Sequence, residues 1–352
     1  MTKVVVAMSG GVDSSVAAAL LKQQGYEVTG MMLRLWSEAG KEDSNRCCTP
    51  DAMALARRVA AKLDIPFYVL DAKEIFHDTV VNYFLEGYAR GETPNPCLIC
   101  NRQIRWEFLL KHALALGAEF MATGHYARIE SEDGRLKLLR AVDRSKDQSY
   151  VLHVLDQGKL RKALFPIGNH TKPEIRKLAE AFGLPTASRH DSQDLCFLAG
   201  EDYRLFLQRN AADMLKPGDI ITKDGAVVGR HTGLANYTIG QRKGLGISSS
   251  VPLYVLKKNA AANAVIVGTQ DELGLRELIA HDTNWISGDV PNGSFRAEVK
   301  IRYTAKEAEA LAIPLEHGQI QVQFDEPQRD ITAGQAAVFY QGDVLLGGGL
   351  IQ

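Results

Sequence analysis

The side chains of this 352-residue sequence that are best suited to chemistry are three cysteines and a short run of glycine and serine. Cys97 and Cys100 form a Cys-x-x-Cys pair that follows two prolines, in the segment Thr93-Pro94-Asn95-Pro96, and precedes a predicted helix. A thiol near a helix N-terminus has its thiolate stabilised, which favours nucleophilic chemistry. Cys196 stands about one hundred residues further along the chain. The spacing therefore indicates two thiols in one segment and a third from a distant one.

Three interpretations fit this set of cysteines: a structural metal site, a redox pair and a sulfur relay. A tetrahedral zinc site needs four ligands, and neither a His-x₃-His pattern nor a second Cys-x-x-Cys pair supplies the fourth. The redox pair and the relay remain open on the residues alone. Cys47 and Cys48 are adjacent to each other and have ordinary neighbours, so we expect them to be small residues of a loop.

The strongest local signal is the run Ser9-Gly10-Gly11-Val12-Asp13-Ser14-Ser15. It follows an apolar stretch typical of a buried strand and opens a helical pattern. Glycines let the backbone approach a ligand, serines add hydroxyl donors, and the helix N-terminus attracts an anion. Asp13 beside a phosphate is repulsive on its own, so we expect it to help hold Mg²⁺. The segment predicts a phosphate-binding turn.

Two other nucleotide-binding classes are excluded by their missing motifs. The sequence contains no G-x-x-x-x-G-K-[ST], which excludes a Walker NTPase. No G-x-G-x-x-G follows a predicted strand, so nothing supports dinucleotide binding. The run at Ser9–Ser15 instead resembles the PP-loop of the ATP pyrophosphatase superfamily, whose members cleave ATP between the α and β phosphates.

The elements that must position these residues are strands alternating with helices over the first 200 residues. We predict strands at Lys3–Met8, Glu27–Leu33, Pro66–Leu70 and Glu119–Thr123, and helices at Ser14–Gln24, Asp51–Leu63, Glu74–Tyr88 and Thr171–Phe182. The last of these helices opens with a capping box, Thr171 and Glu174. Such alternation predicts an α/β fold with a parallel sheet covered on both faces.

The pattern changes after about residue 205, where glycine turns separate short stretches of β-type residues. The strands expected near the C-terminus are Ala297–Tyr303, Ile320–Phe324, Ala336–Tyr340 and Val344–Ile351. They predict a small antiparallel barrel or sandwich. We therefore expect three domains: a PP-loop ATP-binding domain at 1–204, a small central domain at 205–275, and a C-terminal β-barrel at 276–352.

Composition limits the class of protein and its partners. The net charge is −1, which is not the charge of a protein that coats nucleic acid indiscriminately, although a local basic strip remains compatible with it. No apolar run approaches a membrane span, so we expect no membrane partner. Five cysteines at this length do not make a disulfide scaffold, which favours a reducing, cytoplasmic location.

Taken in order, the motifs resemble those of the tRNA-specific 2-thiouridylase family, in which sulfur replaces the 2-oxygen of the wobble uridine. They are SGGVDSS at 9–15, TPNPC-x-x-CN at 93–101, ATGHYAR at 122–128, DQSY at 147–150, DSQDLCF at 191–197, GQRKGLG at 240–246, and VFY at 338–340 with GGG at 347–349. The resemblance covers essentially the whole chain. It implies that the domain at 1–204 is catalytic and that the central domain at 205–275 is a linker or tRNA-binding domain.

The resemblance implies a role for each matching residue. Cys100 and Cys196 are implied to be catalytic, with Cys196 carrying a persulfide and Cys100 releasing its sulfur through a Cys100–Cys196 disulfide. The ATP site is implied at Ala7, Met8, Ser9, Gly10, Gly11, Val12, Asp13, Ser14, Leu33 and Gly124. Contacts with tRNA are implied for Asn95, Cys97, His125, Lys146, Asp147, Gln148, Arg302, Tyr303 and Gln341. The implied partners are a tRNA with a wobble uridine and a protein that donates persulfide sulfur, and the cofactors are ATP and Mg²⁺.

Cys97 departs from the family pattern, because many relatives have aspartate there, and that carboxylate is a candidate general base. A thiol is a softer group that prefers metal or sulfur, so the acid–base assignment is open. Cys97, Cys100 and Cys196 together allow a thiolase that uses a [4Fe–4S] cluster with one open iron. Two further alternatives are an ATP-dependent ligase or amidotransferase, and a non-enzymatic tRNA-binding protein with a vestigial PP-loop.

Overall fold

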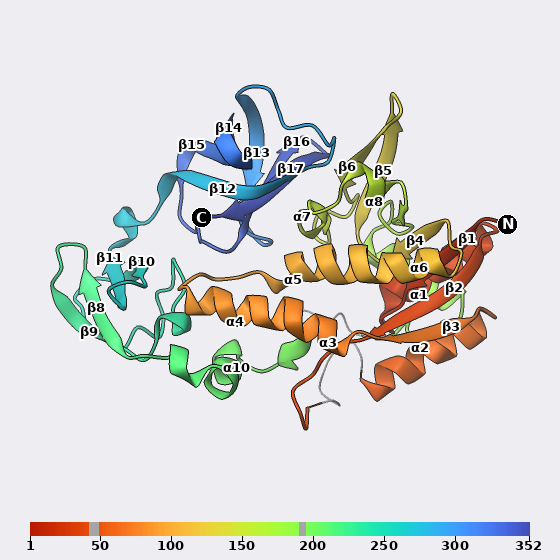
Figure 1. Ribbon diagram of the computed structural model, residues 1–352, viewed down its shortest axis with the longest axis horizontal. Coiled ribbons are helices and arrows are strands. Elements are labelled where there is room, and N and C mark those ends of the chain that lie inside the picture. The colour runs from red at the N-terminus through yellow and green to blue at the C-terminus, as the bar shows by residue number, and fades with distance from the viewer. Residues whose placement is uncertain (42–48, 190–194) are drawn as a thin grey trace.

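The chain folds around three β-sheets, as the computed structural model in Figure 1 shows. The structure describes residues 1–41, 49–189 and 195–352. Cys47, Cys48 and the first four residues of the motif at 191–197 lie outside the described residues. Cys97, Cys100 and Cys196 all lie inside them.

The N-terminal sheet is parallel, as predicted, and its five strands have the order β3-β2-β1-β4-β7. Its strands are β1 (Lys3–Ala7), β2 (Glu27–Arg34), β3 (Phe67–Asp71), β4 (Phe120–Thr123) and β7 (Ala163–Leu164). Val4 and Val6 point to one face and Val5 to the other, and all three are buried. A strand buried on both faces requires such a continuous apolar run.

Helices cover both faces of this sheet. On the face of Val4 and Val6, the core includes side chains of α1 (Val12–Gln23), α2 (Pro50–Lys62) and α9 (Lys172–Ala181). The opposite face packs on α6 (Leu110–Ala115) and the helical turns before it. The predicted capping box is present at the start of α9, where Glu174 Oε2 accepts from the Thr171 amide at 2.7 Å. The predicted α/β architecture is confirmed.

Two helical runs connect this sheet with the region of the other two: the first leads away from the sheet, and the second returns to it (Figure 1). The helix predicted at 74–88 is present as α3 (Lys73–Phe76), a π-helical stretch at His77–Val81 and α4 (Asn82–Ala89). The second run is α5 (Pro96–Ile99), a π-helical stretch at Cys100–Leu109, and α6. Cys100 is thus the first residue of a π-helical stretch, a geometry often found at functional sites.

The C-terminal sheet is a closed antiparallel barrel of six strands, because β12 pairs with both β15 and β17. The barrel strands are β12 (Leu275–Trp285), β13 (Phe295–Lys300), β14 (Ala308–Pro314), β15 (Ile320–Gln328), β16 (Ala336–Gln341) and β17 (Val344–Ile351). The predicted barrel is confirmed, although β12 and β14 were not predicted. A hairpin of β5 (Ala127–Glu132) and β6 (Arg135–Arg140) extends it, with Leu139 opposite Val344.

The central sheet has the order β10-β11-β8-β9 and lies between the α4 end and the barrel (Figure 1). Its strands are β8 (Gly218–Thr222), β9 (Val227–His231), β10 (Tyr254–Asn259) and β11 (Ala264–Gly268), and the remaining helices of the described chain are α7 (Ser149–Leu152), α8 (Gln157–Leu160), α10 (Tyr203–Asn210) and five short 3₁₀ turns. Ile220, Val255, Val265 and Val267 form its core.

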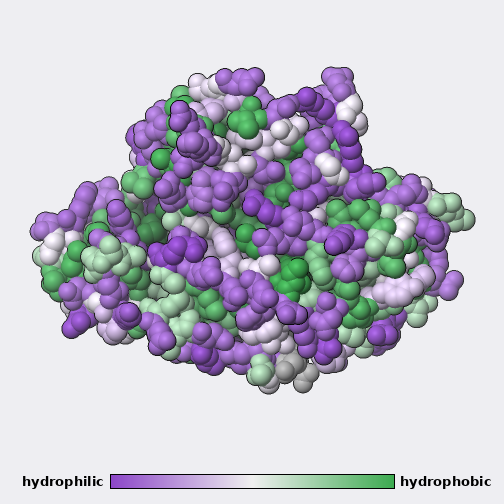
Figure 2. Space-filling model, viewed as in Figure 1, coloured by the Kyte–Doolittle hydropathy of each residue, from purple (hydrophilic) through white to green (hydrophobic). Residues whose placement is uncertain are grey.

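The visible surface is predominantly polar. Figure 2 shows hydrophobic side chains in small, separate groups rather than in one large patch on this face. Among the described residues, every helix is too short or too polar to cross a bilayer.

Candidate active site

The glycine–serine segment after β1 forms a tight turn into α1. Gly10 has a φ of +72°, and a Cβ at this position would lie 2.4 Å from the carbonyl oxygen of Ala52, so the turn requires glycine. Gly11 is the N-cap of α1 and has no side chain to cap the helix. The Ser9 amide donates to Ser14 Oγ at 3.3 Å across the turn. The backbone amides at this helix end suit an anion.

Asp13 lies in the first turn of α1 and is held by two residues from distant segments. Lys172 Nζ lies 2.8 and 2.9 Å from its two carboxylate oxygens, and the Tyr126 hydroxyl donates to Oδ1 at 2.9 Å. Lys172 is only 7% exposed. A buried cation therefore stands beside the turn, and a magnesium ion on Asp13 would share the carboxylate with it.

Gly124 brings the end of β4 against the start of α1. A Cβ on Gly124 would lie 2.7 Å from the Ser14 nitrogen, so the two backbones touch here. Three other residues expected at the ATP site, Ala7, Met8 and Leu33, lie at the ends of the neighbouring strands. Ala7 pairs with Met31 and Thr123, and the Met8 amide donates to the Met31 carbonyl. Leu33 is partly buried opposite Leu70. The carboxyl ends of parallel strands thus converge on the turn, where ligands bind in open α/β sheets.

His125 follows Gly124 and is a buried, neutral imidazole. Burial, followed by the charge of Arg105, holds its pKa well below the usual value. Arg105 Nη1 donates to Nε2 at 3.2 Å, so Nδ1 carries the proton and donates to Thr123 Oγ1 at 2.6 Å. With 4% of its surface exposed, His125 contacts solvent very little in this structure.

The three cysteines differ in environment. Cys97 is exposed, Cys100 is buried, and Cys196 is partly buried. Cys100 belongs to an apolar cluster with Phe197 and Leu198, against which Cys196 packs. The structure thus brings the segments of Cys100 and Cys196 together although 96 residues separate them in the chain.

No metal site joins these cysteines. Among the residues in the three described ranges, no three His, Cys, Asp or Glu side chains are grouped so that they could hold a metal ion. Cys97, Cys100 and Cys196 all belong to those ranges, so the structure gives no support to a three-cysteine [4Fe–4S] cluster.

The loop before Cys97 is fixed by both other sheets. The Thr93 amide donates to the Ala333 carbonyl at 2.9 Å, and the Asn95 amide donates to that of Gly334 at 3.2 Å, both in the barrel. Lys258 of β10 donates to the Glu92 carbonyl at 3.1 Å. Burial lowers the pKa of Lys258 to about 8.

Asparagines hold the backbone of Cys97 itself. Asn95 Oδ1 accepts from the Cys97 amide at 3.2 Å, and Asn101 Nδ2 donates to the Cys97 carbonyl at 3.0 Å. The Cys-x-x-Cys turn is therefore a rigid element. Asn95, predicted to touch tRNA, acts in this structure as the N-cap of α5.

Two of the residues predicted to touch tRNA after β6 make internal contacts. Asp147 is buried, and its carboxylate accepts from the Ala141 amide at 2.9 Å and from the Ser149 hydroxyl at 2.7 Å. Gln148 Oε1 accepts from the Tyr126 amide at 3.1 Å. Lys146 is half-buried beside them. Asp147 and Gln148 thus shape the backbone next to the turn.

The barrel supplies the remaining predicted residues. Arg302 Nε donates to the Asp330 carbonyl at 3.0 Å, and Nη2 lies 3.5 Å from the Ile239 carbonyl of the central segment. Tyr303 is 40% exposed, and burial, followed by the charges of Asp147 and Cys97, raises its pKa. Tyr303 therefore lies near two residues of the N-terminal domain, whereas Gln341 is exposed at the end of β16.

Sequence reasoning missed several residues that complete the site. Lys172 was recognised only as part of a helix start, Tyr126 only as part of a motif, and Lys258 not at all. Arg189 Nη1 donates to the Gly10 carbonyl at 2.8 Å and was also missed. No local pattern marks these residues, because each reaches the site through a long-range contact.

Comparison with known proteins accounts for the whole chain. Three family profiles match it: "tRNA methyl transferase HUP domain" at residues 2–200, "tRNA methyl transferase PRC-barrel domain" at 204–269, and "Aminomethyltransferase beta-barrel domain" at 275–351.

Curated relatives match at full length. The chain is 49% identical to "tRNA-specific 2-thiouridylase MnmA 2" of Caldanaerobacter subterraneus, covering 99% of this chain and 98% of the relative. It is 49% identical to "tRNA-specific 2-thiouridylase MnmA" of Moorella thermoacetica and 45% identical to that of Clostridium perfringens, each with 99% and 98% covered. The order of motifs, the turn at Ser9–Ser15 and these full-length matches lead to one conclusion: the chain belongs to the tRNA-specific 2-thiouridylase family.

Proposed function

We propose that this protein catalyses the ATP-dependent 2-thiolation of the wobble uridine of tRNA. The observation that carries the proposal is the arrangement around α1: an anion-binding turn, Asp13 and the buried Lys172 stand where the carboxyl ends of β1 and β4 meet. A site of this kind serves the phosphates of ATP. The family relationship supports tRNA as the second substrate.

The first step activates the base. The 2-oxygen of uridine attacks the α-phosphorus of ATP, the α–β bond breaks, and pyrophosphate leaves. The amides of the Ser9–Ser15 turn and the Lys172 ammonium stabilise the charge that develops on the phosphates. Asp13 is the residue that would hold a Mg²⁺ ion bound with ATP, and such an ion would neutralise charge on the phosphates. Adenylation converts a poor leaving group into AMP.

The second step delivers sulfur. The terminal sulfur of a persulfide on Cys196 attacks C2 of the uridine, and AMP leaves. The Cys100 thiolate then attacks Cys196 Sγ, the sulfur–sulfur bond breaks, and 2-thiouridine is released as a Cys100–Cys196 disulfide forms. A two-electron reductant of the dithiol class restores both thiols. The shared apolar cluster of Cys100 and the Cys196 segment supports this pairing.

We assign Cys97 a role in positioning the base and none in binding metal. Cys97 is exposed, and its backbone is fixed by Asn95 and Asn101. Burial, followed by the charges of Asp147 and Cys97, raises the pKa of Tyr303. Cys97 and Tyr303 thus border one surface, on which an unstacked base can lie against the ring. The remaining proposed contacts with tRNA are Asn95, Lys146, Gln148, Arg302 and Gln341, together with the backbone around the buried His125 and Asp147. A persulfide-carrying protein supplies the sulfur to Cys196.

Release of pyrophosphate from ATP, measured with and without tRNA, tests this function. The thiolase is expected to release pyrophosphate only when tRNA is present and to form 2-thiouridine when persulfide sulfur is added. A ligase or amidotransferase would release pyrophosphate with an amine and tolerate loss of Cys100. Binding of tRNA without any pyrophosphate release would indicate a non-enzymatic protein and contradict the proposal.

A further inference from the structure

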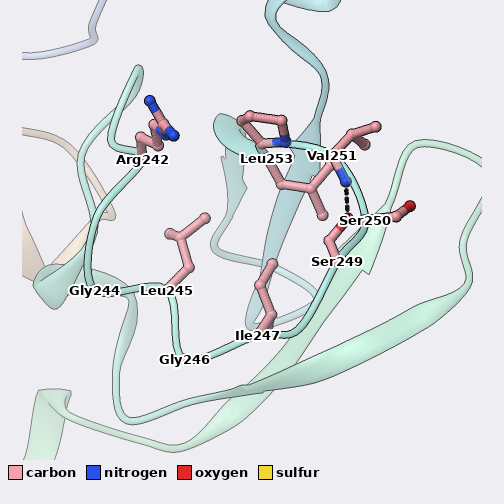
Figure 3. A pocket seen from close by; sticks show the side chains of 10 residues that line it. Arg242, Gly244, Leu245, Gly246, Ile247, Ser249, Ser250, Val251 and Leu253 are labelled. Atoms are coloured by element: carbon pink, nitrogen blue, oxygen red, sulfur yellow. Dashed lines mark hydrogen bonds between the residues drawn. The ribbon is translucent and has the colours of Figure 1, made fainter.

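The loop at residues 242–250 of the central segment, here called the basic loop, frames an open cavity of about 420 Å³. Arg242 stands on one side of the opening, and Ser249 and Ser250 lie on the other (Figure 3). The side chains of Leu245 and Ile247 lie between them. This cavity involves none of the residues assigned above to ATP or to sulfur transfer.

The backbone of the basic loop offers an unusual number of free donors. Within the described chain, none of the nine amides from Arg242 to Ser250 donates a hydrogen bond to another protein atom. Gly244 and Gly246 have φ of +77° and +68°, so left-handed residues alternate with Leu245. Alternation of this kind turns successive amides toward one side and creates a concave anion site.

The sequence on both sides of the loop carries only positive charges. Residues 231–270 contain Arg242, Lys243, Lys257 and Lys258 and no aspartate or glutamate. The chain as a whole is almost neutral, with a net charge of −1. This stretch is therefore a local basic strip that attracts a polyanion, which the overall charge conceals.

The root of the loop is hydrogen-bonded to β10 of the central sheet and lies against the barrel. The Gly240 amide donates to the Val255 carbonyl, and the Val255 amide donates to that of Gln241, both at 2.9 Å. A Cβ on Gly240 would lie 2.5 Å from Asp330 Oδ1 of the barrel. Arg302 reaches the neighbouring Ile239 carbonyl at 3.5 Å. An anion in the loop would therefore be held at a set position relative to the barrel.

We propose that the basic loop binds a backbone phosphate of the RNA substrate, through its free amides and the side chains of Arg242 and Lys243. This inference rests on the proposed function, since it takes tRNA as the polyanion. Amides and a guanidinium read the phosphate and not the base, so the contact fixes the register of the RNA without selecting its sequence. The loop then acts as a second anchor, away from the reacting uridine.

The salt dependence of tRNA affinity tests this role. For the Arg242→Ala/Lys243→Ala double variant, we expect about tenfold weaker binding near 0.1 M salt, with the slope of log Kd against log salt reduced by about 1, because one phosphate contact is lost. The Gly244→Ala/Gly246→Ala variant distorts the amides but keeps every charge. It should weaken binding several-fold with the slope unchanged.

Matched controls lie in the same segment. Gly225 has a φ of +91° and, like Gly246, open space around its Cβ position. Arg230 is an exposed arginine outside the basic loop. The Gly225→Ala and Arg230→Ala variants should therefore retain the wild-type tRNA affinity and salt slope. Unchanged tRNA affinity in both loop variants would overturn the inference, as would an equal loss in the controls. Inorganic phosphate and ATP are the competing probes: if the loop variants lose ATP affinity instead, the ligand is a nucleotide. Wild-type protein that fails to bind tRNA would refute the proposed function rather than the loop's role.

Discussion

Substituting Gly124 with alanine should damage ATP chemistry without affecting tRNA binding. The new Cβ would lie 2.7 Å from the Ser14 nitrogen, 2.9 Å from the Asp13 carbonyl carbon and 3.0 Å from the Ser14 Cα. All three are backbone atoms of the first turn of α1, so no flexible side chain can move aside. The only relief is a shift of α1 away from β4.

The size of this shift follows from the contact distances. An ordinary contact begins near 3.4 Å, so the backbones must separate by about 0.7 Å. Overpacking of this kind costs about 1 to 3 kcal/mol of unfolding free energy. Displacing a reacting group by up to about 1 Å costs about 10- to 100-fold in rate. We therefore expect a folded variant with a loss of that size in tRNA-dependent pyrophosphate release.

The assay compares pyrophosphate release, tRNA affinity and thermal unfolding for Gly124→Ala and Gly293→Ala. Gly293 is exposed, with nothing within 4 Å of its Cβ position, so the control should behave as wild type in all three measurements. Gly124→Ala should lose pyrophosphate release and keep its tRNA affinity. A folded Gly124→Ala protein with wild-type ATP kinetics would show that the approach of β4 to α1 does not shape the ATP site.

Four further predictions concern single residues. Asp13→Ala should abolish pyrophosphate release while circular dichroism shows a folded protein; normal thiolation by this variant would remove Asp13 from the ATP site. Lys172→Met should lower pyrophosphate release by about 100-fold and Lys172→Arg should recover part of it, because the cation beside the turn stabilises developing charge; equal activities of the two variants would argue against an electrostatic role. Cys196→Ser should fail to accept sulfane sulfur, whereas Cys100→Ser should accept it and fail to release it, as followed by mass spectrometry of the protein; wild-type thiolation by Cys100→Ser would contradict the disulfide step. Burial lowers the pKa of Lys258 to about 8, against 10.5 in the unfolded chain, so the folded state loses this proton first as the pH rises. Between pH 8 and 10.5, the unfolding free energy of the wild type should therefore rise by about 3 kcal/mol relative to that of Lys258→Met. Parallel pH profiles of the two proteins would show that Lys258 is not buried as a charge.

The sequence was most informative where the signal is local. The strand, turn and helix at Lys3–Gln24 and the capping box of Thr171 and Glu174 depend on neighbouring residues, and both are present. The barrel was predicted from four alternating stretches. Its strand β12 was missed because Gly274 precedes it and charged residues interrupt its alternation.

Long-range contacts explain what could not be predicted. Lys172 meets Asp13 across 159 residues, and Leu139 of the β5–β6 hairpin pairs with Val344 of the barrel. Nothing in the neighbourhood of either residue specifies its partner, since the pairing follows from how whole sheets pack. The grouping of the Cys100 and Cys196 segments was expected only from the family resemblance, and the distribution of thiols between surface and core required the structure.

The loop at Thr93–Asn95 links the N-terminal domain to both of the other sheets. This segment is bonded to the barrel through Ala333 and Gly334 and to the central sheet through Lys258. An RNA bound to both the central sheet and the barrel would therefore contact the two parts of the protein that hold the segment of Cys97 and Cys100 in place. Such an arrangement can align a bound tRNA with the ATP site before adenylation.

The most direct test of the account is nucleoside mass spectrometry of tRNA after incubation with the enzyme, ATP, Mg²⁺ and a persulfide donor. The account predicts 2-thiouridine at the wobble position, with one AMP and one pyrophosphate released for each thiouridine formed, and no product from Cys100→Ser or Cys196→Ser. Thiouridine formed without ATP cleavage, or formed by a protein that lacks both cysteines, would contradict the central claim.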